Sequence, residues 1–167
     1  CNVKVMAPVS FVSKYQFWKQ NAFQKRIPYS ETVYGVDVLR PSFFYLPKFL
    51  RPLNGFFYFF SVLPSVLKVR RGYKFDMIYA VNAFPDGFAA AMLGRFLNIP
   101  VVVQAIGTDI NVYTNLYFRK KAILWALKRC ASVISVSKAM RQRLVGLGID
   151  EGKILVSYNG IDRRLFR

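Results

Sequence analysis

Residues 75–106 read FDMIYAVNAFPDGFAAAMLGRFLNIPVVVQAI, and the order of apolar and turn residues in this stretch decides the fold. It predicts a buried strand over 75–81, a turn at 85–87, a helix of small residues over 87–97 and a second buried strand over 101–106. Both strands are continuous apolar runs, which is typical of parallel sheets covered on both faces. The stretch therefore predicts a β-α-β unit.

The same rhythm continues to residue 157. We expect a helix over 117–130, a strand over 131–136, a helix over 138–147 and a strand over 153–157. Ser137 caps the second helix, and Gly148 ends it. Right-handed crossovers would place helices on both faces of the sheet. The fold class that follows is α/β: a three-layer, Rossmann-like domain with a mainly parallel sheet.

The first 74 residues are less regular. A short strand over 2–8 stops at Pro8, and 31–41 is expected to form strand, turn and strand around Gly35. Residues 9–30 predict no element, and the proline-punctuated stretch 41–54 reads as a loop. A phenylalanine-rich helix follows over 55–71. Together with the later elements, this predicts one domain over 1–167.

Composition excludes several kinds of site. The chain has 25 Lys and Arg, 8 Asp and Glu, no His and 2 Cys, for a net charge of +17. Without His there is no Ser-His-Asp triad and no His-ligated zinc. No metal site is expected, and Cys1 and Cys130 read as unpaired thiols of a reducing, cytoplasmic compartment. Neither a complete Gly-x-Gly-x-x-Gly fingerprint nor a Walker A run is present.

The charge indicates an anionic partner. The apolar run after Arg51 is too short and too broken by Pro52 and Pro64 to span a bilayer, so its helix either packs in a core or lies on a membrane surface. The candidate membrane or anion surface consists of Phe56, Phe57, Phe60, Lys68, Arg70 and Arg71. A second basic group on the two later helices is either a solvated face or an anion-facing patch. It comprises Arg119, Lys120, Lys121, Lys128, Arg129, Lys138, Arg141 and Arg143. No nucleic-acid-binding signature stands out, so nucleic acid is the less favoured partner.

Ligands of open parallel sheets bind beyond the carboxyl ends of the strands. Gly107 allows close backbone approach there, and Thr108 and Asp109 can hydrogen-bond sugar hydroxyls. The alternative is a plain turn in which Thr108 or Asp109 caps the next helix. The residues alone leave both interpretations open.

Four stretches, in order, resemble segments of one family, the retaining glycosyltransferases of family 4, which have the GT-B fold of two Rossmann-like domains. They are YGVDVLRP at 34–41, FDMIY with FPDG at 75–79 and 84–87, IPVVV with GTDIN at 99–103 and 107–111, and ASVISVS with KILVSYNGID at 131–137 and 153–162. The resemblance is to the N-terminal, acceptor-side half of these enzymes.

This resemblance implies transfer of a sugar from a nucleotide-sugar donor to a polysaccharide or lipid-linked acceptor, with retention of configuration at the anomeric carbon. The donor domain would follow Arg167, and the first strand with its glycine-rich loop would precede Cys1. We therefore expect the 167 residues alone to be inactive, with no metal and no cofactor bound in this segment.

The family motif assigns acceptor-side roles to Gly107, Thr108, Asp109 and Asn111, with Asp86 and Gly87 as neighbours. Asn82 departs from the motif but can still hydrogen-bond a sugar hydroxyl of the acceptor, although it cannot act as a base. The motif assigns an interdomain turn to Asn159, Gly160 and Asp162. Ile106 and Asn82 stand where many members carry His, so no His-assisted role is carried over. The main catalytic groups are expected in the other domain.

Two functions follow from these expectations. The first is the acceptor-binding domain of a glycosyltransferase, cytoplasmic and peripheral at the inner face of the membrane. The second is a non-catalytic basic module that docks to anionic membranes or polyanions. A salt-dependent preference for anionic vesicles would favour a membrane-docking surface, and both functions can hold together.

Overall fold

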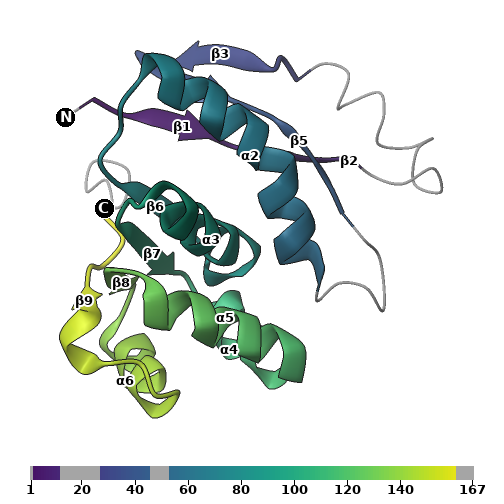
Figure 1. Ribbon diagram of the computed structural model, residues 1–167. Helices are drawn as coiled ribbons and strands as arrows, with labels where there is room; N and C mark the ends of the chain where they lie inside the picture. The colour runs from purple at the N-terminus through teal and green to yellow at the C-terminus, as the bar shows by residue number, and fades with distance from the viewer. Residues whose placement is uncertain (1, 12–26, 46–52, 161–167) are drawn as a thin grey trace. The chain divides into compact units, whose positions relative to one another are not determined.

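A computed structural model describes residues 2–11, 27–45 and 53–160 of the chain (Figure 1). The chain divides into two compact units, Cys1–Lys74 and Phe75–Arg167. Each unit is described by itself below. The expectation of one domain over 1–167 stays a prediction.

The first unit contains two small sheets. In one, β4 (Val36–Leu39) pairs in parallel with β1 (Lys4–Met6) and antiparallel with β3 (Ser30–Val33). Tyr34 and Gly35 join β3 to β4 with φ of 50° and 80°. Positive φ at both central residues is the geometry that two-residue hairpins favour, so the expected strand, turn and strand are confirmed.

The second sheet corrects two sequence-based expectations. Strand β2 (Val9–Phe11) pairs in parallel with β5 (Ser42–Phe44). The sequence predicted no element at the position of β2 and a loop at the position of β5. The Val9 amide also donates to the Pro41 carbonyl at 2.9 Å. A strand of three residues is too short to show a clear alternation of apolar and polar residues. It also forms only when a partner strand supplies hydrogen bonds, so its own sequence does not predict it.

Helix α2 (Asn54–Gly72) confirms the predicted helix over 55–71. The helix packs against β5, with the ring centroids of Phe43 and the buried Tyr58 4.7 Å apart and those of Phe44 and the half-buried Phe57 5.7 Å apart. Within the described ranges, no helix is both long enough and apolar enough to cross a membrane.

The second unit holds a four-stranded sheet in the order β6-β7-β8-β9, all parallel. Its strands are β6 (Ile78–Val81), β7 (Val101–Ala105), β8 (Ser132–Ser135) and β9 (Ile154–Val156). Helices α3 (Phe88–Leu97), α5 (Tyr117–Arg129) and α6 (Lys138–Gly146) connect them in turn. The α/β class and the mainly parallel sheet are confirmed.

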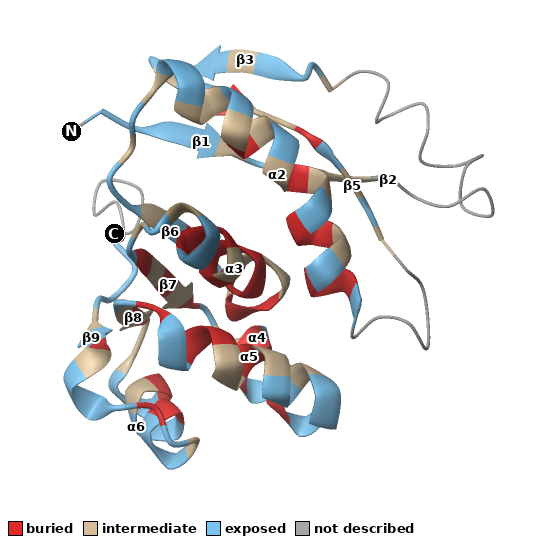
Figure 2. Cartoon of the chain, in the orientation of Figure 1, coloured by how far each residue is buried: buried red, intermediate tan, exposed pale blue. Residues whose placement is uncertain are grey.

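One face of this sheet carries the core. Strand register aligns Ala80, Val103, Val133 and Ile154 in one row across the sheet, and all four are buried. Leu127 of α5 and Leu144 of α6 are fully buried in the same cluster (Figure 2). The three helices therefore share one face.

The opposite face is more open: Tyr79 and Leu155 on it are exposed, and Val102 and Ile134 are half-buried. We expected helices on both faces, and among the described residues of this unit they lie on one. The physical reason is that the strand order runs in a single direction, so right-handed crossovers all return on the same side.

Short helical segments fill the strand-end connections. They are η2 (Ala83–Gly87), α4 (Thr108–Asn111), η3 (Tyr113–Asn115) and η4 (Glu151–Lys153). The Ser137 hydroxyl accepts from the Met140 amide at 3.1 Å, and Gly148 has φ of +82°, so the predicted start and stop of α6 are confirmed.

Candidate functional site

Two loops lie side by side at the carboxyl edge of the second unit's sheet. One follows β6 and the other follows β7, and these strands pair in parallel with Val81 opposite Gln104. The Asn82 amide extends the pairing by donating to the Gln104 carbonyl at 3.0 Å. The loops that were predicted from separate sequence motifs therefore begin as neighbours.

Asp109 ties the two loops together. One carboxylate oxygen accepts from the amides of Gly107 at 2.8 Å and Ile110 at 3.1 Å, within its own loop. The other accepts from Ala83, in the loop after β6, at 2.8 Å and from Ile106 at 3.4 Å. A carboxylate is well suited to this because it accepts several hydrogen bonds and donates none.

Asp109 was predicted to contact the acceptor, and the structure gives it another role. Its side chain is only 1% exposed, and four backbone amides occupy its oxygens. It holds the loops in place and presents no free oxygen to a ligand. This is closer to the structural alternative than to sugar binding.

Gly87 is also internal. It is buried, its amide donates to the Asn82 carbonyl at 2.9 Å, and an added Cβ would lie 2.9 Å from both that carbonyl oxygen and Val103 Cγ1. Glycine is required here because the loop presses on β7. Its predicted neighbour in the site, Asp86, is half-buried.

The remaining predicted residues are accessible. Thr108 and Asn111 are exposed and Asn82 is half-buried, with φ of 77°. A Cβ added to Gly107 would meet nothing within 4 Å, so the space over this glycine is open. Hydroxyl and amide groups around open space suit hydrogen bonding to sugar hydroxyls.

Arg119 and Arg143 support these loops, and the sequence did not reveal this role of the two arginines. The Arg119 guanidinium lies 4.5 Å from the Tyr113 ring centroid and 5.9 Å from that of Phe84. Arg143 donates to the Asn111 carbonyl at 3.3 Å. Both residues were recognised as basic, but their partners are distant in sequence, so no local pattern could assign them.

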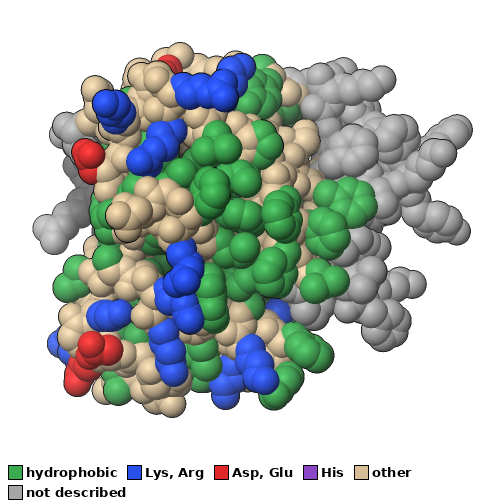
Figure 3. Space-filling view, viewed as in Figure 1, with side chains coloured by type: hydrophobic (Ala, Val, Ile, Leu, Met, Phe, Trp, Pro, Cys, Tyr) green, Lys and Arg blue, Asp and Glu red, His purple; other side chains and the backbone are tan. Residues whose placement is uncertain are grey.

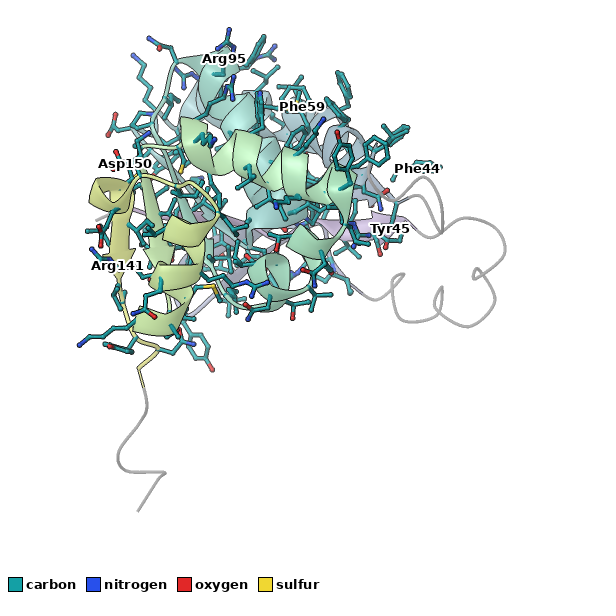
Figure 4. All side chains as sticks on the ribbon, turned by 90° about the horizontal axis from the view of Figure 1, so that it is seen from below. Phe44, Tyr45, Phe59, Arg95, Arg141 and Asp150 are labelled. Atoms are coloured by element: carbon teal, nitrogen blue, oxygen red, sulfur yellow. The ribbon has the colours of Figure 1, made fainter. Side chains whose placement is uncertain are left out.

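Part of the basic group on α5 and α6 is already engaged. Arg141 projects from α6 (Figure 4) and pairs with Glu151 at 2.9 Å. Arg129 stacks on Trp125, with 4.6 Å to the ring centroid. Among residues 2–11, 27–45 and 53–160, no three His, Cys, Asp or Glu side chains gather where they could hold a metal ion.

Other predicted residues fall outside this edge. On α2, Phe56 and Phe60 are exposed, whereas Phe57 is half-buried against Phe44. Lys68 and Arg71 are exposed, and Arg70 is half-buried. Beyond β9, Asn159 and Gly160 are exposed, and Asp162 lies outside the described residues, so the interdomain turn stays a prediction.

Cys130 belongs to the core. Its thiol donates to the Leu127 carbonyl at 3.0 Å, and burial raises the pKa of the thiol, partly offset by the positive charge of Lys153. Cys1 lies outside the described residues.

Comparison with known proteins identifies relatives of the chain. It is 29% identical over 145 residues to the Bacillus subtilis (strain 168) protein TuaC, which is named as a candidate teichuronic acid biosynthesis glycosyltransferase. It is 24% identical over 119 residues to MJ1178 of Methanocaldococcus jannaschii, an uncharacterized glycosyltransferase. The two alignments cover 86% and 70% of the chain but 36% and 32% of the relatives, so the chain spans about a third of their length.

The fold is shared with a solved structure, Anabaena HepE in complex with UDP. The TM-score is 0.55 at 20% sequence identity, over 95% of this chain and 38% of HepE. The sequence profile of glycosyltransferase family 4 matches residues 19–165, nearly the whole chain. The chain therefore belongs to glycosyltransferase family 4.

Proposed function

We propose that this chain is the acceptor-binding part of a glycosyltransferase. The complete protein would move a sugar from a nucleotide-sugar donor to a saccharide or lipid-linked saccharide, with retention of configuration at the anomeric carbon. The chain spans about a third of the relatives it matches, so donor binding is assigned to the rest of the protein.

The observation that carries this proposal is the paired loop edge. Asp109 fixes two loops next to each other, while Asn82, Thr108 and Asn111 remain accessible around the open space at Gly107. These groups are neutral hydrogen-bonding side chains, which can orient hydroxyl groups but cannot act as a general base at neutral pH. Their role is to position an acceptor hydroxyl.

In the proposed reaction, the acceptor hydroxyl oxygen forms a bond to the anomeric carbon, the bond from that carbon to the donor diphosphate breaks, and the hydroxyl proton passes to the departing diphosphate oxygen. The diphosphate carries away the electron pair. Residues outside this chain would stabilise its charge electrostatically, so no metal is called for in this segment. HepE binds UDP, which makes UDP-sugars the first donors to test here.

The test measures transfer by the full-length protein, with labelled UDP-glucose and other UDP-sugars as donors and a membrane lipid extract as acceptor. In the variant Thr108→Val with Asn111→Ala, we expect the acceptor KM to rise about tenfold and the donor KM to stay unchanged. A rise in the donor KM alone would contradict an acceptor role. The isolated 167 residues should transfer no sugar.

A second candidate function is docking to an anionic membrane through α2. Leu53, which directly precedes α2, and Phe56 and Phe60 in its first turns are exposed apolar side chains, and Lys68 and Arg71 are exposed near its end. Such a helix can lie in a bilayer surface with its cations among the headgroups. The change Phe56→Ser with Phe60→Ser should weaken binding to anionic vesicles. Unaltered binding would reject this surface, and with it the evidence from α2 for a peripheral position at the inner face of the membrane.

A further inference from the structure

The segment around α5 has an unusual charge pattern. Residues 110–149 contain eight Lys and Arg and no Asp or Glu. Three of these cations, Arg119, Lys120 and Lys121, follow one another in the first turns of α5. None of them forms an ion pair with a carboxylate in the part of the chain that the structure describes. The first turns of α5 therefore present uncompensated positive charge.

Large apolar side chains surround these cations without being buried. Leu116 is 50% exposed, Tyr117 64% and Phe118 67%. The helix buries Ile123, Ala126 and Leu127 further along, so the sheet is already covered without these side chains. Exposed apolar side chains gathered in one place indicate an interaction surface, because single ones scattered over a protein are ordinary but clusters are not.

The side chains form an ordered arrangement. The Tyr117 and Phe118 rings meet edge to face with centroids 5.4 Å apart, and Lys121 Nζ lies 4.4 Å from the Tyr117 centroid. We call Leu116, Tyr117, Phe118, Lys120 and Lys121 the α5 cluster. Figure 3 shows Lys and Arg side chains beside hydrophobic ones over the lower part of the molecule, where α5 runs in Figure 1.

The cluster lies at the same sheet edge as the acceptor loops. Helix α5 connects the end of β7 to the beginning of β8, so it starts at the carboxyl edge and finishes at the amino edge. Arg119 also links the cluster to the loop after β6, since it stacks on Tyr113 and lies 5.9 Å from the Phe84 ring. An object bound by the cluster would sit beside the candidate site.

The chemistry of the cluster fits a bilayer surface better than a nucleic acid. Both are anionic, and both can accept an aromatic ring. Leu116, and Val112 four residues earlier in the chain, are exposed aliphatic groups that gain nothing from base stacking but gain free energy in the acyl-chain boundary. Tyr and Lys suit the level of the lipid headgroups, because the apolar part of each side chain can be buried there while its hydroxyl or ammonium group remains hydrated.

We infer that the α5 cluster docks the protein on an anionic lipid bilayer and so brings the loop edge to the membrane surface. This surface consists of other residues than the one on α2, and it lies next to the acceptor loops of its own unit. Docking itself does not depend on the proposed sugar transfer. Its usefulness does, because a lipid-linked acceptor would be met at that surface.

The experiment measures binding of the full-length protein to sedimented vesicles, without donor or acceptor. One set of vesicles contains equal parts of phosphatidylcholine and phosphatidylglycerol, and the other contains phosphatidylcholine alone. The test variant is Phe118→Ser with Lys120→Gln and Lys121→Gln. Loss of two cations near an anionic surface should lower the partition coefficient about 30-fold, and loss of the ring should lower it further. Binding of the unaltered protein should weaken as salt is added.

A matched control makes the same chemical changes at the amino edge: Phe96→Ser with Arg95→Gln and Lys128→Gln. Phe96 is 62% exposed, Arg95 (Figure 4) lies near the end of α3, and Lys128 lies in the last turn of α5. We expect a change in the partition coefficient of less than about twofold for this control. All six altered side chains are exposed, so both variants should fold, and equal melting temperatures would verify this.

Several results would overturn the inference. Equal losses in the two variants would mean that binding follows net charge and not this cluster. Unchanged binding of the test variant, or equal binding to both kinds of vesicle, would reject the surface outright. If the test variant keeps vesicle binding but loses binding to an oligo-deoxythymidine probe, the cluster binds nucleic acid instead. Failure of sugar transfer is a separate readout, since these measurements contain no donor.

Discussion

Gly87 and Gly107 occupy comparable places, each in the loop that follows one of two neighbouring parallel strands. Their surroundings differ completely. A Cβ at Gly87 would lie 2.9 Å from the Asn82 carbonyl oxygen and from Val103, whereas a Cβ at Gly107 would meet nothing within 4 Å. One glycine lets the protein pack against itself, and the other borders open space. Residues from the family's motifs therefore divide between those that hold the two loops together and those that border open space.

The largest effect is expected at Asp109, which serves both loops. Asp109→Ala would leave four backbone amides without their acceptor. Each buried donor left unpaired costs about 1–3 kcal/mol, but water reaching the cavity would satisfy some of them. We expect the free energy of unfolding to fall by about 3–5 kcal/mol, measured by urea denaturation.

Asp150 provides the control for this change. It is exposed, and its carboxylate accepts one backbone hydrogen bond, from Gly152 at 3.0 Å. Asp150→Ala should lower the free energy of unfolding by about 1 kcal/mol. If the two variants lose similar amounts of unfolding free energy, the amides around Asp109 are not held by its carboxylate.

Gly87→Ala should have the next largest effect. The added methyl group overpacks the contact between the loop and β7, which typically costs about 1–3 kcal/mol. Gly146→Ala is the matched change in open surroundings on α6, where alanine favours the helix by about 0.5–1 kcal/mol. Thermal melts of the two variants should shift in opposite directions. If Gly87→Ala leaves the melting temperature unchanged, Gly87 would not be closely packed against β7 and would resemble Gly107.

The sequence predicted the β-α-β rhythm of the second unit because each strand there is a continuous apolar run with a turn on either side. It could not predict β2 and β5, whose three-residue strands depend on each other. Nor could it predict the burial of Asp109, because the Ala83 amide that it binds lies 26 residues earlier in the chain. A motif identifies the residues of a site, but only their neighbours in space separate the residues that support it from those that are accessible.

Asn82 stands between these two classes. Its backbone has φ of 77°, which favours glycine or asparagine, while its side chain is half-buried at the open edge. Asn82→Gly should therefore leave stability within about 0.5 kcal/mol, whereas Asn82→Ala should cost about 1 kcal/mol. If the amide binds the acceptor, both variants raise the acceptor KM of the full-length protein equally. An increase in Asn82→Ala alone would trace the effect to the backbone.

Gly107→Ala should have the smallest effect on stability and the most informative effect on function. The methyl group enters empty space, and φ of 169° is extended backbone, so unfolding should change by less than about 0.5 kcal/mol. If an acceptor approaches this glycine closely, the same methyl group would displace it, and the acceptor KM should rise about tenfold while the donor KM stays constant. A variant that is stable and binds acceptor normally would mean that the open space over Gly107 is ordinary surface, and the acceptor would then have to be sought along Asn82 and Asn111. A stable variant with weakened acceptor binding would separate the two glycines by experiment as the structure separates them by distance.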